Sequence, residues 1–207
     1  TATPCNKRQP GAGCSARAGF NRNHSVLGTS EHCIASHPSD MCVALAALDA
    51  VVSVIGPGGE RRIPLVEFHR LPGDEPNIDT NLCKDELITA VELPEKGFSE
   101  KYAYIKVRDR ASYAFALVSA AAALEMDGQT IREARIALGG LAHKPWRDPG
   151  VEKLLHGQNA GEDKFREVAD ALLRGAKGFA HNNFKIDLAR RVIVRALTQA
   201  AAKEGRP

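Results

Sequence analysis

Four of the five cysteines in the sequence fall between residues 5 and 42, at Cys5, Cys14, Cys33 and Cys42. Zinc sites usually contain a close Cys-x-x-Cys pair, and these spacings include none. An iron–sulfur cluster needs four thiolates from a loop that can wrap around it, and wide spacings are tolerated when that loop is irregular. Disulfides in a loop-rich, secreted module are the competing interpretation. The spacing favours a metal or cluster site over disulfides, with zinc in third place.

Cys42 differs from the three cysteines before it. It follows Met41 in a segment rich in Ala, Leu and Met, a composition that predicts a helix over residues 41–49. A free cysteine in an apolar helix is usually a small buried hydrophobic residue. Cys83 is isolated and is interpreted as a bystander. The three loop cysteines are thus one short of a cluster set, so either Cys42 or a cysteine that precedes Thr1 completes it.

The cysteines must be positioned by the elements around them. Residues 1–39 contain Gly, Pro, Asn and Ser without a periodic apolar pattern, which predicts a long irregular loop. Such a loop must be held in place, and the cysteines are the residues expected to hold it. Ser39 or Asp40 is the expected N-cap of the following helix. The alternation of apolar residues and the turn signals between them predict strands over residues 50–55, 60–65 and 86–93, the first two as a hairpin.

The pattern changes at residues 94–97, which we interpret as a domain boundary. Beyond it, apolar runs around an Asp-Gly turn predict strands over residues 101–108, 114–125 and 131–138. Apolar residues at three- and four-residue spacing then predict helices over residues 150–156, 165–173 and 185–202. Three antiparallel strands followed by helices make a small α+β domain.

Composition and charge exclude several classes of protein. The net charge is +3 with acidic and basic residues interspersed, so no nucleic-acid partner is expected. No apolar run approaches the roughly 20 residues of a membrane helix, so no membrane insertion is expected. The chain opens without Met or an apolar signal segment, which indicates a processed or truncated protein.

The spacing of His24, His32 and His37 suits no helix-borne metal pair, and hydrogen bonding is their expected role.

Longer motifs in the sequence resemble a known family. They are PCNKR at 4–8, PGAGC at 10–14, SEHCIASHPSDM at 30–41, KVRDRASYAFALVS at 106–119 and LGGLAHKPWR at 138–147. These motifs resemble the FAD-binding subunit of molybdenum hydroxylases of the xanthine dehydrogenase family. The similarity is greatest to the three-subunit periplasmic aldehyde oxidoreductase type, whose flavin subunit carries an additional 4Fe-4S cluster besides FAD.

The resemblance implies a fold in two parts. Residues 1–94 correspond to the second lobe of a two-lobed FAD-binding domain, with an iron–sulfur loop at 1–39, and residues 98–204 to the C-terminal domain. The first lobe of the family carries a Gly-rich pyrophosphate loop. Neither glycine cluster here, at 56–59 or 139–140, follows a strand and opens a helix as such a loop should. The N-terminal part of the flavin domain is therefore expected to be missing.

The resemblance also implies a set of cluster ligands. Cys5, Cys14 and Cys33 match three of the four cysteines that hold the cluster in this family. The fourth belongs to a segment that precedes residue 1. Cys42 falls where relatives commonly carry Ala, which favours its interpretation as a buried residue.

The resemblance also implies flavin contacts at three further positions. Asp40 matches an acidic residue that contacts FAD, and Ile88 matches an apolar residue that packs near the ring. Lys106 matches a lysine near the isoalloxazine, where a cation would stabilise the anionic reduced flavin. From the residues alone, Asp40 is interpreted as a helix N-cap, and the alternatives are a strand core residue for Ile88 and a solvated lysine for Lys106.

The function implied by the resemblance is electron transfer. Electrons would pass from a molybdenum-cofactor subunit, through 2Fe-2S clusters in a small subunit, to FAD here and then to an external acceptor. The substrate site would lie on another chain, so no catalytic residue is expected in this one. The resemblance points to the periplasm, with the cytoplasm as the alternative. The competing class is a non-enzymatic truncated fragment or interaction module that does not hold FAD by itself.

Overall fold

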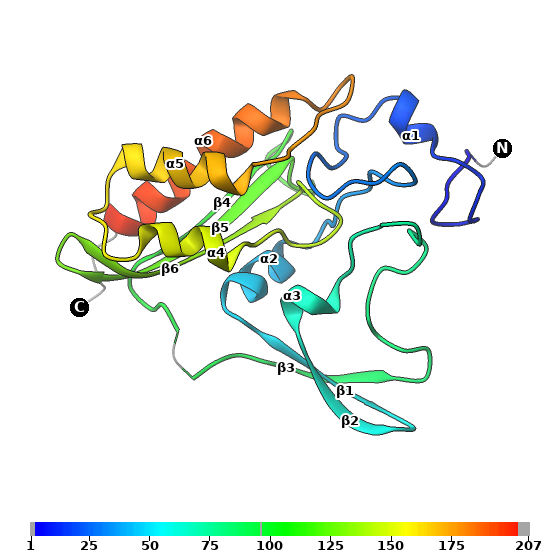
Figure 1. Cartoon of the computed structure of the whole chain (residues 1–207), viewed down its shortest axis with the longest axis horizontal. Helices are drawn as coiled ribbons and strands as arrows, with labels where there is room; N and C mark the ends of the chain where they lie inside the picture. Colours follow the sequence, from blue (N-terminus) through cyan, green and yellow to red (C-terminus); the bar gives the residue numbers. More distant parts are fainter. Residues whose placement is uncertain (1–2, 96, 203–207) are drawn as a thin grey trace.

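Two three-stranded antiparallel sheets organise the chain, with strand orders β2-β1-β3 and β4-β5-β6. The structure is a computed structural model, and it describes residues 3–95 and 97–202. Figure 1 shows β1–β3 in the lower part of the molecule and β4–β6, with the longer helices, in the upper part. The α+β fold class expected from the sequence is confirmed, as is the three-stranded antiparallel sheet followed by helices.

The first sheet is built around a hairpin. β1 (Val51–Gly56) pairs with β2 (Gly59–Pro64) on one side and with β3 (Leu87–Glu92) on the other, both antiparallel. Gly59 has a φ of +95°, a left-handed conformation that glycine adopts without steric cost, so it closes the turn. The short helix α3 (Leu65–Phe68) follows β2 directly. The predicted hairpin and the third strand are confirmed.

Helix α2 (Asp40–Ala47) joins the two parts of the molecule. Its N-cap is Ser39, one of the two predicted candidates, whose Oγ accepts a hydrogen bond from the backbone N–H of Cys42 at 3.2 Å. Val43 shares one apolar core with residues of the first sheet and with Ala121 of the second. The helix is thus held between the two sheets, and its first turn is fixed in place.

The second sheet carries the larger core. Its strands are β4 (Tyr102–Val107), β5 (Val118–Asp127) and β6 (Thr130–Gly139). The helical segments that follow are α4 (Pro149–Glu152), the 3-10 helix η1 (Lys153–Leu155), α5 (Glu162–Leu172) and α6 (Phe184–Ala202). The predicted helix over 150–156 is thus divided between α4 and η1.

Strand β5 is covered on both faces because successive side chains of a strand point to opposite sides of the sheet. Ala120 and Ala122 lie in the larger core with α5 and α6, and Ala121 lies in the smaller core with α2. Figure 1 shows α6 and α2 on opposite sides of this sheet. The strand begins at Val118 and not at residue 114 as predicted, because residues 108–117 leave the sheet and form a loop.

The N-terminal loop is tied into the second part of the chain. Residues 3–39 contain the short helix α1 (Ser15–Ala18) and otherwise follow an irregular path, as predicted. The backbone N–H of Val26 donates to the carbonyl of Leu141 at 2.9 Å, and the Val26 side chain is buried in the larger core. The expected division assigns the loop to a domain of residues 1–94, yet part of it packs with the helices of the other domain.

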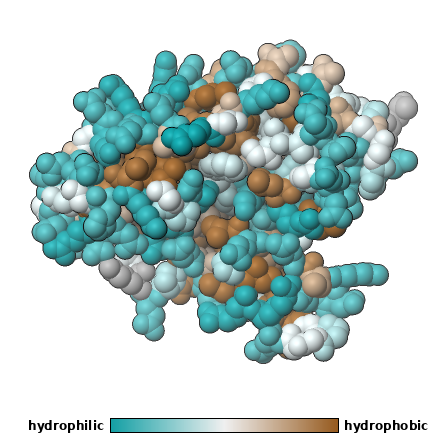
Figure 2. All heavy atoms as spheres, viewed as in Figure 1, coloured by the Kyte–Doolittle hydropathy of each residue, from teal (hydrophilic) through white to brown (hydrophobic). Residues whose placement is uncertain are grey.

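The surface is mixed in character. Figure 2 shows hydrophilic side chains over much of the visible face, with apolar atoms exposed on the lower part that carries the first sheet. Exposed apolar side chains of β1, β3 and the segment after β3 are Ile55, Leu87, Ile88, Val91 and Leu93. Within the described residues, no helix combines the length and apolar character needed to cross a membrane. The last two residues of the expected domain 98–204 lie outside the described residues.

Candidate functional site

A cavity of about 980 Å³ opens beside the first turn of α2. Its walls come from the segment before α2, from the end of β4 and from the loop that follows β4. The cavity brings together Asp40 and Lys106, two of the residues predicted to contact the flavin. The Lys106 Nζ lies 2.7 Å from the Asp40 Oδ2, so the two side chains form an ion pair at the cavity wall.

Tyr104 completes this group of polar side chains. It lies two residues before Lys106 on β4, so both side chains project from the same face of the strand. Its hydroxyl donates a hydrogen bond of 3.0 Å to the Asp40 Oδ1. Burial raises the pKa of Tyr104 to about 12, so the phenol stays protonated and acts as a donor at neutral pH. Asp40 therefore receives one charged and one neutral donor. The sequence motifs gave Tyr104 no role, and its only signal is its period-two spacing from Lys106.

Two exposed aromatic side chains line the same cavity. Tyr113 is 95% exposed and Phe115 is 75% exposed, and both belong to the loop between β4 and β5. Tyr113 has a φ of +51°, a left-handed conformation that is uncommon for a bulky residue and marks local strain. The Arg110 Nε donates to the Tyr113 carbonyl at 3.0 Å and helps to hold this conformation. Flat apolar groups beside a cavity suit an aromatic ligand, and sequence reasoning had given neither residue a role.

Ile88 lies apart from this group. It belongs to β3, pairs with Val54 of β1, and is 43% exposed on the first sheet. The cavity walls come from other segments of the chain. The structure therefore brings Asp40 and Lys106 together and places Ile88 on a separate surface, where its predicted flavin contact stays a prediction.

The three loop cysteines predicted as cluster ligands gather in one region. The backbones of Cys5 and Cys14 form an isolated antiparallel bridge. The buried Asn6 accepts a hydrogen bond from the backbone N–H of Gly13 at 2.8 Å and donates one to the carbonyl of His32 at 2.9 Å. Asn6 therefore ties the segments that carry all three cysteines to one another.

Cys33 is the most deeply placed of the three. Burial raises the pKa of the Cys33 thiol, and the Cys14 and Cys5 thiols raise it a little further. The Ala35 backbone N–H donates a hydrogen bond of 3.4 Å to the Cys33 Sγ, which lowers this pKa and so acts in the opposite direction. All five cysteines lie within the described residues, and all are free thiols.

Cys42 and Cys83 have different surroundings. Cys42 is half-buried in the first turn of α2, with its thiol near the imidazoles of His37 and His69. Cys83 is exposed, and the guanidinium of Arg61 lies 3.8 Å from its sulfur. Cys42 is therefore not the fully buried apolar residue that the sequence favoured, while the isolation of Cys83 from the other cysteines agrees with its interpretation as a bystander.

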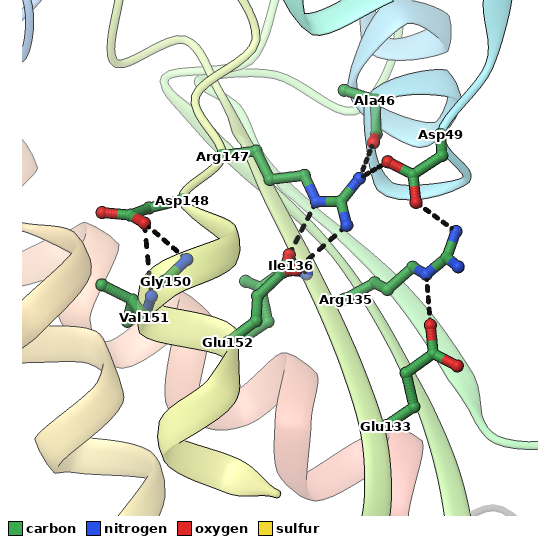
Figure 3. A network of polar contacts seen from close by, with 10 residues as sticks. All are labelled: Ala46, Asp49, Glu133, Arg135, Ile136, Arg147, Asp148, Gly150, Val151 and Glu152. Carbon is green, nitrogen blue, oxygen red and sulfur yellow. Dashed lines mark hydrogen bonds and ion pairs between the residues drawn. The ribbon is translucent and has the colours of Figure 1, made fainter.

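An ion-pair network holds α2 against the second sheet and so fixes the cavity wall (Figure 3). Arg147 Nε lies 2.7 Å from the Oε1 of Glu152, and both side chains are nearly buried, at 5% and 7% exposure. Arg147 also donates to the carbonyl of Ala46 at 2.7 Å, at the end of α2, and pairs with Asp49 just beyond it. The backbone N–H of Ile136 on β6 donates to Glu152 Oε1 at 2.8 Å. The network therefore links α2 to β6 and α4.

Both parts of the chain match known domain families. Residues 22–96 match the FAD binding domain in molybdopterin dehydrogenase. Residues 102–200 match the CO dehydrogenase flavoprotein C-terminal domain. The first match contains Asp40, and the second contains Lys106 and the aromatic loop residues.

Individual relatives agree with these matches. The chain is 50% identical over 205 residues to the aldehyde oxidoreductase FAD-binding subunit PaoB of Escherichia coli, covering 98% of this chain and 61% of that protein. It is 32% identical over 176 residues to the glyceraldehyde dehydrogenase medium chain of Sulfolobus acidocaldarius, covering 80% of this chain and 56% of that protein. Reconstituted CO dehydrogenase from Oligotropha carboxidovorans has the same fold, with a TM-score of 0.69 at 24% identity over 79% of this chain and 57% of that one.

The chain thus spans less than two thirds of the length of these relatives. The matched domains follow one another in the order that the sequence motifs had indicated, and together they account for most of the described residues. The chain thus carries a match to an FAD binding domain followed by a match to a flavoprotein C-terminal domain, and it is similar to the FAD-binding and medium subunits of these oxidoreductases.

Proposed function

We propose that this chain is the electron-transfer flavin subunit of a molybdenum-dependent aldehyde oxidoreductase complex of the xanthine dehydrogenase type. The single observation that carries the proposal is the Asp40–Lys106 ion pair at the wall of a cavity lined by aromatic side chains. One partner of the pair lies in the segment that matches an FAD binding domain. The 50% identity to a protein named as an aldehyde oxidoreductase FAD-binding subunit supports the same function.

The residues around the cavity fit FAD. A bound flavin supplies a centre that takes up electrons singly or in pairs. Lys106 provides a fixed positive charge that favours a reduced, anionic ring, and Asp40 provides acceptor oxygens for ribityl hydroxyls or ring N–H groups. Tyr113 and Phe115 offer apolar faces against which an aromatic ring can pack. We propose Asp40 and Lys106 as flavin contacts, with Ile88 as a third on the separate surface of the first sheet.

The loop thiols fit a 4Fe-4S cluster. We propose that Cys5, Cys14 and Cys33 are three of its four ligands. The three free thiols lie on a loop held together by Asn6, which is what a wrapped cluster requires.

The partners follow from the same proposal. We propose that a molybdenum-cofactor subunit and a 2Fe-2S subunit deliver electrons to this chain, and that an external acceptor removes them. The two relatives are a FAD-binding subunit and a medium chain, which supports an assembly of several chains. We propose the periplasm as the compartment, on the resemblance of the motifs to the periplasmic type.

The competing function is an interaction module in the complex that keeps the fold but carries no redox group.

Cofactor content separates the two functions. The protein is purified anaerobically with its partner subunits, and flavin and iron are measured by absorbance after extraction. The proposed function predicts about one flavin and about four extra iron atoms per copy of this chain. Cys14→Ser should remove that iron and leave the flavin, whereas Cys83→Ser should change neither. A complex without flavin would overturn the proposal in favour of the interaction module, and disulfides among the loop cysteines would overturn the cluster.

A further inference from the structure

A separate set of metal-ligating side chains lies next to the flavin cavity. His37, Cys42 and His69 each offer one ligand atom, and these three atoms all lie within 4.8 Å of one another. His37 also lines the cavity, so one of the three side chains belongs to its wall. These residues are separate from the loop cysteines proposed for the cluster.

The three side chains come from different segments whose backbones are fixed. The backbone N–H of His37 donates to the carbonyl of Ala142 at 2.9 Å. Cys42 is held in the first turn of α2 by its hydrogen bond to Ser39. His69 follows α3, and its backbone forms an isolated bridge with Thr80. A site whose ligands are anchored in this way needs little rearrangement to close around an ion.

The histidines are prepared to act as neutral ligands. The Nε2 of His37 is buried and has no hydrogen-bond partner, which is costly for a polar atom. The His37 and His69 ring centroids are 4.3 Å apart. Burial lowers the pKa of both rings, that of His69 to about 4, so both stay neutral at pH 7 and keep a lone pair for a metal. The expected hydrogen-bonding role therefore does not account for the His37 Nε2.

We propose that His37, Cys42 and His69 bind one divalent transition-metal ion of the zinc class, with a water molecule as the fourth ligand. Two imidazoles and one thiolate are the donors that zinc accepts, whereas magnesium and calcium prefer oxygen. Zinc–nitrogen bonds of about 2.0–2.1 Å and zinc–sulfur bonds of about 2.3 Å place tetrahedral ligands roughly 3.3–3.7 Å apart. Small side-chain rotations are enough to bring the three atoms from their present spacing to that distance.

The surrounding charges permit a cation. Asp79 is the nearby carboxylate that favours positive charge on both histidines. His143 opposes that charge on both rings, and Lys144 opposes it on His69. Asp79 also contacts Lys7 and His143, so the negative charge of Asp79 does not act on the two histidine ligands alone. Cys42 lies in the first turn of α2, so its sulfur faces the site from a fixed position. A bound ion would fix the start of α2 and thereby the position of Asp40.

Zinc binding to the complete complex, with its cluster loaded, tests the site. Zinc is added alone, excess is removed by dialysis against a weak chelator, and bound zinc and iron are counted in the same samples. We expect one zinc ion per chain, and X-ray absorption at the zinc edge should show two nitrogen ligands and one sulfur ligand. Cys42→Ser and His69→Gln should weaken zinc binding by more than roughly 100-fold, because changes beyond the direct ligands already cost about 10–100-fold.

Two matched variants separate this site from the cluster loop. Cys83→Ser, at an exposed cysteine, should keep the zinc, and Cys14→Ser should lose iron while keeping zinc with its mixed nitrogen and sulfur ligands. The proposal is overturned if no variant or wild-type sample retains zinc. It is also overturned if zinc has only sulfur ligands and is lost in Cys14→Ser but not in Cys42→Ser, because the ion would then sit at the loop thiols. None of these outcomes depends on whether the flavin proposal holds.

Discussion

The Lys106 ammonium lies 2.7 Å from the Asp40 carboxylate, although 66 residues separate the two in the chain. One side chain comes from the first turn of α2 and the other from the end of β4. The pair therefore exists only because α2 packs against the second sheet. Asp40 belongs to the segment that matches the FAD binding domain, and Lys106 belongs to the segment that matches the C-terminal domain. The ion pair therefore connects the two segments at the cavity wall, and it is the geometric basis of the proposed flavin site.

Replacing the lysine tests its effect on the flavin. Lys106→Met removes the positive charge but keeps most of the volume of the side chain. Losing one charge-assisted interaction of about 1.5–3 kcal/mol with the reduced ring should lower the two-electron midpoint potential by roughly 30–60 mV. A spectroelectrochemical titration of the complex measures this shift. Lys164→Met, on the surface of α5, is the control, and an equal shift in both variants would contradict the assigned role.

The buried ion pair of Arg147 and Glu152 predicts a large effect on stability. Glu152→Ala leaves the Arg147 charge with one carboxylate partner fewer and leaves the Ile136 backbone N–H without its acceptor. Breaking a buried pair in this way should reduce the free energy of unfolding by about 3–5 kcal/mol. Urea unfolding followed by circular dichroism measures the change. Glu167→Ala, at an exposed pair on α5, should cost no more than about 1 kcal/mol, and similar losses in the two variants would argue against the network.

The buried Lys185 predicts a pH dependence at alkaline pH. Its ammonium lies 2.9 Å from the His24 carbonyl and also contacts the Gly140 carbonyl, and burial lowers its pKa to about 8. Between pH 8 and the ordinary lysine pKa of 10.5, the unfolded chain holds a proton that the folded chain has released. Stability should therefore rise with pH across this window, by up to about 3 kcal/mol.

Lys185→Met provides the comparison for that pH dependence. The variant lacks the titrating group, so its free energy of unfolding should rise less than that of the wild type between pH 8 and 10.5. The difference between the two proteins cancels the contributions of other lysines, tyrosines and cysteines. Parallel urea midpoints at both pH values would show that Lys185 keeps an ordinary pKa in the folded state.

The sequence predicted the elements better than their arrangement. The hairpin, the strands of the second sheet and the helix capped by Ser39 follow from local apolar spacing and turn residues, and those signals depend on few neighbours. The start of β5 was wrong because residues 114–117 continue its apolar composition. The loop that contains these residues includes Tyr113 in a left-handed conformation, which no local pattern signals.

The site was less predictable because its contacts are long-range. Asp40 and Lys106 were singled out by motif resemblance, and the spacing of the residues alone gave no reason to pair them. Lys185 has the sequence pattern of an ordinary amphipathic helix, and the carbonyls that surround it come from two distant loops. The His37–Cys42–His69 set needs α3 beside α2, so an interpretation based on helix spacing could not find it.

The most direct test of the central claim is reduction of the flavin by an aldehyde in the intact complex. An anaerobic stopped-flow experiment mixes the complex with aldehyde and follows the flavin absorbance without an external acceptor. The proposed function predicts that the flavin band bleaches as electrons arrive from the molybdenum subunit, and that it returns when an acceptor is added. A flavin that stays oxidised while the complex converts aldehyde would contradict the electron-transfer role assigned to this chain.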